Sequence, residues 1–135
     1  MPATTGLVTG VDFVSLPTED LDEAKSFYAG VLGLEHSSTW QKEGEDPLGM
    51  EFEAGPVTIS LIASARLGIP FQANKVPIAL HVDDVEEARA ELESRGVEFP
   101  AETIDSGVCH MANFHDPDGN ALLLHHRYAP LPDRD

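Results

Sequence analysis

The sequence has little cysteine, few basic residues and no long apolar stretch. A single cysteine, Cys109, occurs among 135 residues, so the chain can form neither an internal disulfide nor a thiolate metal cage. Lysine and arginine total 8 against 24 aspartate and glutamate residues, which gives a formal net charge of -16. Such a surface repels phosphate backbones and anionic lipids, which argues against nucleic acid and membrane partners. No apolar run approaches the roughly 20 residues of a membrane span.

The remaining composition is typical of a globular protein. Hydrophobic residues make up 41% of the chain, which is enough to build a core. The length fits one domain, or two small modules that share one core. The first residues lack the basic stretch and apolar segment of a secretory signal, so we expect a cytoplasmic location.

A strand signal followed by a helix signal opens the first half of the chain. Residues 11–16 have the composition of a strand. Asp20 follows, with Glu23 three residues later, which is the spacing of a capping box at a helix start. Apolar residues at helical spacing then predict a helix over 21–31.

The same signals return 64 residues later, which indicates an internal repeat. Residues 78–82 predict a strand, and Asp84 with Glu87 repeats the cap chemistry of the first half. The second helix is expected to stop near Gly96, because glycine adopts the backbone conformation that ends helices.

Each predicted helix is followed by three strand signals. These cover residues 34–40, 50–53 and 57–62 in the first half, and 97–99, 109–114 and 121–126 in the second. The sequence therefore predicts an α+β fold of two tandem βαβββ modules, which form a curved mixed sheet around a cavity with the helices outside. We assign the first module to residues 9–62, the linker to residues 63–76 and the second module to residues 77–128.

Several short motifs accompany the repeat: Asp20-Leu21, Phe27-Tyr28, Val31-Leu32-Gly33-Leu34, Val82-Asp83-Asp84, Arg95-Gly96-Val97 and Asp116-Pro117-Asp118-Gly119-Asn120. With these motifs, the chain resembles the vicinal oxygen chelate superfamily over residues 9–128. That superfamily includes glyoxalase I, extradiol dioxygenases and the bleomycin-resistance binding proteins. The resemblance implies the fold described above and a homodimer, but it leaves the reaction open, because one scaffold hosts many functions.

The resemblance also implies where a metal site would lie. Metal-dependent members bind a divalent ion through histidine and glutamate on the first and last strands of each module. The corresponding positions here hold Phe13, Ser60, Pro77 and Leu123. None of these residues is a usual ligand of a divalent metal. We therefore expect no cofactor, and a relocated divalent ion is the alternative.

Two histidines are the leading polar candidates. Side chains alternate across a strand, so His81 shares a face with residue 77, and His125 shares a face with residue 123. This pair would contact a ligand, act as an acid and base, or hold a relocated metal. Hydrogen-bonded histidines in a pocket wall would give the same pattern.

Aromatic residues suggest the character of the ligand. Trp40 is the only tryptophan, and it either stacks on a planar ligand or covers a sheet edge. Phe13, at a position where metal-dependent relatives hold a ligand, would make the cavity floor apolar. The candidate ligand-binding residues are Phe13, Trp40, Ser60, His81, Asn113, Leu123 and His125.

Three functional hypotheses follow. The first is a protein that binds a small apolar or aromatic molecule without the usual metal site. The second is a glyoxalase-, isomerase- or dioxygenase-like enzyme, in which His81 and His125 perform acid and base chemistry or hold a relocated metal. The third is a protein whose role lies in a complex with another protein.

Overall fold

The computed structural model describes residues 6–130. The first half contains β1 (Phe13–Pro17), α1 (Leu21–Lys25), η1 (Ser26–Val31), β2 (Glu35–Trp40), β3 (Gly49–Ala54) and β4 (Val57–Ile62). A short 3-10 helix, η2 (Ser64–Leu67), lies in the connection to the second half. The second half contains β5 (Ile78–His81), α2 (Val85–Ser94), β6 (Ile104–Asp105), β7 (Cys109–His115) and β8 (Ala121–Arg127).

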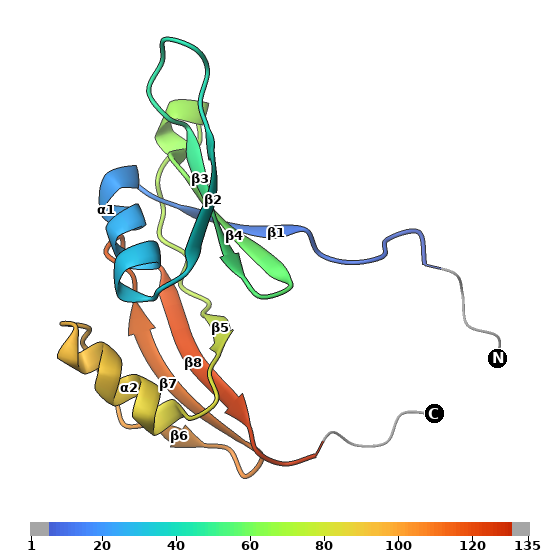
Figure 1. Ribbon diagram of the computed structural model, residues 1–135, viewed down its shortest axis with the longest axis vertical. Helices are drawn as coiled ribbons and strands as arrows, with labels where there is room; N and C mark the ends of the chain where they lie inside the picture. The colour runs from blue at the N-terminus through green and yellow to red at the C-terminus, as the bar shows by residue number, and fades with distance from the viewer. Residues whose placement is uncertain (1–5, 131–135) are drawn as a thin grey trace.

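The strands form two mixed sheets with the same topology. Their orders are β1-β4-β3-β2 and β5-β8-β7-β6. The β1–β4 and β5–β8 pairs are parallel, and the other pairs are antiparallel. The predicted fold of two βαβββ modules is confirmed. Within residues 6–130 the eight strands form two separate four-stranded sheets, with both helices on the same side of the molecule (Figure 1).

Both helices begin at the predicted aspartate caps. The Asp20 side chain accepts a 3.1 Å hydrogen bond from the Glu23 backbone amide, and Asp84 accepts a 2.9 Å bond from that of Glu87. These bonds satisfy amide groups that a helix start leaves without partners. The second helix ends at Ser94, next to the predicted stop near Gly96.

The first helix changes type along its length. After α1 the chain continues directly as a π-helix, η1, and the Leu32 amide donates to the Phe27 carbonyl five residues earlier at 2.9 Å. Within this π-helical segment the consecutive side chains of Phe27 and Tyr28 are both buried. The predicted helical extent of 21–31 is therefore confirmed, with a π-helical second half.

One predicted strand is wrong. Residues 97–99 do not form a strand, and the sixth strand is Ile104–Asp105 instead. The Val97 amide donates back to the Leu92 carbonyl at the end of α2, and the Phe99 ring packs 5.2 Å from the Phe114 ring. The segment therefore packs its side chains against the core and does not pair with a neighbouring strand.

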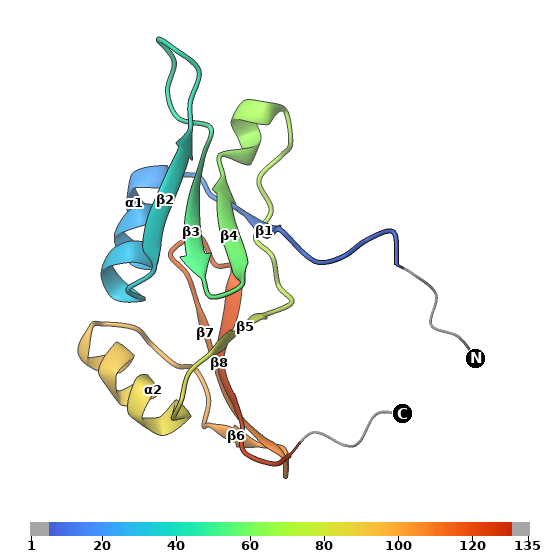
Figure 2. The same ribbon diagram turned by 45° about the vertical axis from the view of Figure 1, so that its right-hand side comes forward.

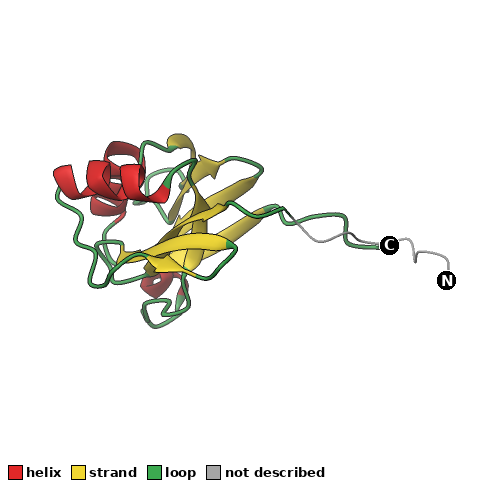
Figure 3. Cartoon of the chain, turned by 90° about the horizontal axis from the view of Figure 1, so that it is seen from below, coloured by secondary structure: helices red, strands yellow, loops and turns green. Residues whose placement is uncertain are grey.

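A single core joins the two modules on the helix side of the sheets. The Phe27 and Phe114 rings, one from each module, lie 6.5 Å apart between their centroids. Figure 3 shows the two helices together on one side of the strands. Within residues 6–130, neither α1, η1 nor α2 covers the opposite face of either sheet, and we call these the open faces. No helix among residues 6–130 is long and apolar enough to cross a membrane.

Candidate functional site

The open face of the first sheet holds two of the predicted site residues on its parallel strand pair. Leu16 and Ile59 are buried in the core, so alternation places Phe13 and Ser60 on the opposite, open face. Ser60 lies beside Ser15 in the β1–β4 register and is buried. Phe13 is 53% exposed. An exposed phenyl ring therefore lies at the start of β1.

Trp40 lies at the end of β2, the edge strand of the same sheet. It is 47% exposed and pairs with Gly49 of β3. A Cβ atom at Gly49 would lie 3.7 Å from the indole ring, 3.1 Å from the Leu61 carbonyl oxygen and 3.0 Å from an Ile62 methyl carbon. The absence of a side chain at Gly49 therefore leaves room for these neighbours.

Two carboxylates on β3 give this open face its charge, and the predicted site set does not include them. Glu51 pairs with Ser60 in the β3–β4 register and accepts a hydrogen bond from Ser38. Glu53 accepts hydrogen bonds from Ser37 and, at 2.8 Å, from Thr58. The bond from Ser37 and then that from Thr58 lower the pKa of Glu53, so its carboxylate stays ionised. Alternation of Glu51 and Glu53 about the buried Phe52 is the sequence signal for this arrangement.

The strand ladders of the second sheet bring the other four predicted residues next to one another. His81 and His125 are direct partners in the parallel β5–β8 ladder. Leu123 pairs with Asn113 in the antiparallel β7–β8 ladder. Because Leu122 and Leu124 are buried in the core, Leu123 and His125 belong to the open face.

His81 lies at the exposed end of the edge strand β5. Its side chain is 71% exposed, and its Nε2 atom lies 3.4 Å from a carboxylate oxygen of Asp83. The His81 ring also lies 6.0 Å from that of His126, whose Nδ1 atom is buried without a hydrogen-bond partner. The exposed imidazole is free to reach a ligand or a water molecule.

The residues at the superfamily's metal positions do not fit a metal. Phe13, Pro77 and Leu123 have no donor atom in their side chains, and Ser60 offers only a hydroxyl group. Among residues 6–130 no group of three or more histidine, cysteine, aspartate or glutamate side chains is arranged to hold an ion. The two open faces instead combine aromatic rings, carboxylates and imidazoles.

Within residues 6–130 the two open faces belong to two separate sheets. Phe13, Trp40 and Ser60 belong to the first sheet, and the other four predicted residues belong to the second. Of the seven, only His81 lines one of the main cavities found within the described residues.

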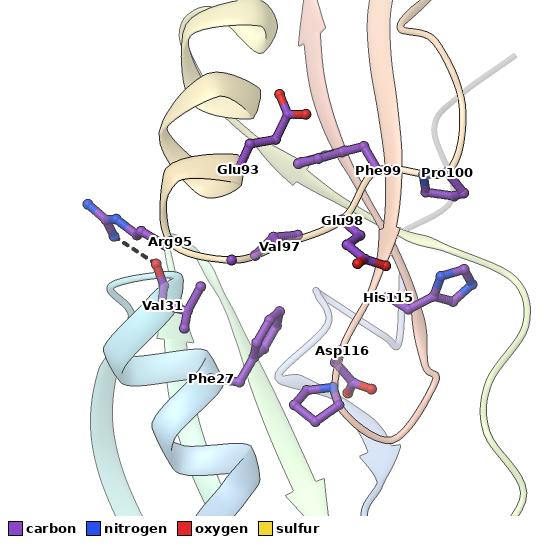
Figure 4. Close-up of a pocket in the computed structure, with 12 residues that line it drawn as sticks. Phe27, Val31, Glu93, Arg95, Val97, Glu98, Phe99, Pro100, His115 and Asp116 are labelled. Atoms are coloured by element: carbon purple, nitrogen blue, oxygen red, sulfur yellow. Dashed lines mark hydrogen bonds between the residues drawn. The ribbon is translucent and has the colours of Figure 1, made fainter.

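One of these cavities is an open groove on the helix side. It has a volume of about 860 Å³ and lies between η1, the end of α2 and the β7–β8 turn (Figure 4). The Arg95 guanidinium lies at its edge and donates a 2.7 Å hydrogen bond to the Val31 carbonyl. His115 lines the other end, and Asp116 is already bonded to Tyr28. The groove is mixed in polarity and open to solvent.

A second cavity, of about 790 Å³, lies between the modules. Figure 2 shows β5 next to the turn that joins β3 and β4, and both segments line this space. Its walls are mostly aliphatic, and Val14, Ile59 and Leu124 are among them. It is the more apolar of the two large cavities.

Comparison with known proteins agrees with this architecture. The sequence profile of the Glyoxalase/Bleomycin resistance protein/Dioxygenase superfamily matches residues 10–124. The chain therefore belongs to this superfamily, and the resemblance seen in the sequence is confirmed. No curated protein matches the chain significantly.

Several solved structures share the fold. One is TnmS3, described as an antibiotic binding protein, from Streptomyces sp. CB03234, with 23% identity, a TM-score of 0.75, and coverage of 91% of this chain and 99% of that chain. Another is a superfamily member from Sphaerobacter thermophilus, with 22% identity, a TM-score of 0.76, and coverage of 88% and 98% respectively. A lactoylglutathione lyase from Agrobacterium tumefaciens has 18% identity and a TM-score of 0.72, with coverage of 87% and 93%. At these identities the similarity establishes the fold.

Proposed function

We propose that this protein binds a small apolar or aromatic molecule at its open faces without the usual metal site of the superfamily. The observation that carries the proposal is the exposure of two aromatic rings on one open face, Phe13 on the edge strand β1 and Trp40 on the opposite edge strand β2. The two rings lie four residue rows apart, so each offers a separate stacking surface. Exposed aromatic rings gain free energy when a planar apolar ligand covers them. The likeness to TnmS3, which is described as an antibiotic binding protein, supports this class of function. The proposed location is the cytoplasm.

We further propose that two chains pair to close the site. The strands β1 and β5 are edge strands of their sheets, and each presents an unpaired row of backbone groups. Residues 6–12 extend away from the body next to β1 (Figure 1), and Leu7, Val8 and Val11 are at least 61% exposed there. Pairing of β1 with β5 of a second copy would cover these groups. It would also bring the open face of one first module next to the open face of the other chain's second module.

Trp40 is a built-in reporter for the binding test, because the chain has no other tryptophan. We expect small polycyclic aromatic compounds to quench its fluorescence with saturation. His125→Ala should weaken this binding at least tenfold. His110→Ala is the matched control, because His110 lies on the next strand but pairs with His126 on the other face of the sheet. Equal affinities of the two variants, or no saturable quenching by any compound, would contradict the proposal.

An enzyme is the second candidate function, and the His81–His125 pairing across β5 and β8 favours it. Metal content decides between an enzyme that uses the two histidines as acid and base and an enzyme that uses them to hold a relocated metal ion. Protein purified without chelator would be exposed to Ni, Zn, Mn and Fe and assayed by inductively coupled plasma mass spectrometry. About one retained equivalent that disappears in both His81→Ala and His125→Ala would establish a relocated metal site and overturn the metal-free proposal. Substoichiometric metal under every condition would agree with the metal-free proposal.

A further inference from the structure

The cavity between the modules is separate from the open faces. Val14 and Ile59 line it, and both side chains point to the helix side of the first sheet. Phe13 and Ser60, their neighbours in sequence, belong to the opposite face. Of the seven residues proposed for the open faces, only His81, at the rim, also lines this cavity. A ligand in this space would therefore lie behind the sheets, next to the helices.

Several chain segments surround the cavity. The helix α2 contributes Ala88 and Leu92, and β5 contributes Ile78 and Leu80. The β3–β4 turn, Leu32 and Leu34 form further parts of the walls. Enclosure from these directions favours a compact molecule over an extended polymer. The volume of about 790 Å³ lies within the range of roughly 300–1,000 Å³ that is typical of small-molecule sites.

The lining side chains are not fully packed against one another. Val14, Leu34, Ile78, Leu80 and Val82 lie against the core, yet each stays only partly buried. Water in such a space makes few favourable contacts with aliphatic walls, so an apolar molecule that displaces it gains free energy.

Charge at the rim restricts the ligand further. The Arg95 guanidinium donates to the Glu91 carboxylate at 3.0 and 3.1 Å and to the Val31 carbonyl at 2.7 Å. The Glu91 carboxylate therefore balances the positive charge of Arg95, and the rim offers no net charge to a ligand head group from this pair. Apart from His81 the remaining wall is apolar, which favours a neutral molecule over one with an ionised carboxylate or ammonium group.

We propose that the cavity between the two modules is a second binding site, which takes a neutral, largely apolar small molecule between α2, β5 and the β3–β4 turn. Of the seven candidate open-face residues, this site shares only His81, which lies at its rim. Its occupant needs an apolar body with no ionised group, and at most one hydrogen bond, which His81 at the rim would make.

The test uses the neutral fluorescent probe N-phenyl-1-naphthylamine, whose emission rises in apolar surroundings. We expect saturable binding of one equivalent per chain when the open faces lack their aromatic rings, in Phe13→Ala and Trp40→Ala. Ala88→Leu should weaken it at least tenfold, because the larger side chain occupies the cavity from α2. Ala54→Leu fills the space from β3 and should act in the same way. Ala90→Leu is the matched control, because Ala90 lies on the exposed face of α2, and it should leave the affinity unchanged.

The open-face variants Phe13→Ala and Trp40→Ala separate this proposal from the proposed function. Probe binding that survives both substitutions but is lost in Ala88→Leu and Ala54→Leu supports the second site. Binding that is lost in Trp40→Ala and kept in both cavity variants overturns the second site and supports the open faces. If the probe shows no saturable binding, the second site is overturned. The proposal for the open faces is not affected, because the Trp40 titration tests it separately. Probe affinity that falls as the chain dimerises would also overturn it, because a second copy would then fill the space.

Thermal unfolding followed by circular dichroism accompanies each titration. Ala54→Leu and Ala88→Leu enter the cavity from different modules, so a folding defect in one leaves the other available. Loss of probe binding counts only for a variant whose unfolding transition is as cooperative as that of the unmodified protein in the same assay.

Discussion

The Tyr28 hydroxyl donates a 2.7 Å hydrogen bond to the Asp116 carboxylate, which lies 88 residues further along the chain. Tyr28 belongs to η1 of the first module, and Asp116 begins the turn between β7 and β8 of the second. Both residues are buried, with Tyr28 fully so. The bond therefore joins the two modules inside their common core.

Removal of this hydroxyl should destabilise the protein without opening a cavity. Tyr28→Phe keeps the ring and leaves the Asp116 carboxylate with its bonds from the Asp118 and Asn120 backbone amides and the Asn120 side chain. A lost hydrogen bond to a buried charged group corresponds to about 1.5–3 kcal/mol. Urea unfolding measures the change. Tyr128→Phe is the control, because Tyr128 is 46% exposed, and it should change stability by less than about 0.5 kcal/mol.

Stability should also fall in alkali because of Tyr28. Burial, and then the nearby charge of Asp116 and the hydrogen bond to it, raise the pKa of Tyr28 far above its ordinary value of 10.0. The folded state keeps the Tyr28 proton, while the unfolded chain loses it above pH 10. The contribution of Tyr28 to the free energy of unfolding is therefore fully present below pH 10 and declines above it. The stability difference between unmodified protein and Tyr28→Phe should therefore shrink by up to about 1.4 kcal/mol per pH unit. Urea unfolding between pH 9 and 11.5 tests this, and a constant difference would contradict it.

Substitution of Asn120 should lower the stability of the protein more than the small size of its side chain suggests. Its fully buried amide donates to Asp116 at 2.9 Å and to the Pro17 carbonyl at 2.8 Å, and it accepts from the Asn74 backbone amide at 2.8 Å. Asn120→Ala leaves these groups without partners, so we expect a loss of about 3 kcal/mol. Asn113→Ala, the same substitution on an open face, should cost less than about 1 kcal/mol in the same unfolding assay. Similar losses for both variants would show that the buried network contributes little.

The proposed pairing of chains predicts a concentration-dependent dimer. Sedimentation velocity should show it, and Val11→Glu should weaken it at least tenfold, because a charge would enter the covered edge. Val11 is 61% exposed in the single chain, so the variant should fold normally. Leu67→Glu, at an exposed position on η2, is the control and should leave association unchanged. A monomer at every concentration would contradict the pairing.

Local chemistry made much of the fold predictable. Asp20 and Asp84 cap their helices through amides only three residues away, so the sequence pattern alone located both helix starts. The strand 57–62 was likewise predicted with the bounds that the structure shows. The strand expected at 97–99 failed, because strand pairing depends on a distant partner, and Phe99 instead packs on Phe114.

The candidate sites were also predictable only in part from the sequence. Strand alternation was enough to predict that His81 shares a face with residue 77 and His125 with residue 123, and the parallel register then placed the two histidines side by side. The cavity between the modules could not be predicted, because Val14 and Leu80 read as ordinary core residues in the sequence.

The sequence by itself determined the repeated module, its helix starts and its acidic surface, because these follow from side chains a few residues apart and from composition. Only the tertiary structure decided that Tyr28 bonds to Asp116, that the two sheets stay separate within one chain, and that an apolar space remains between the modules. Each of these depends on how segments distant in sequence pack together. Packing fixes such distances through the shape of the whole core.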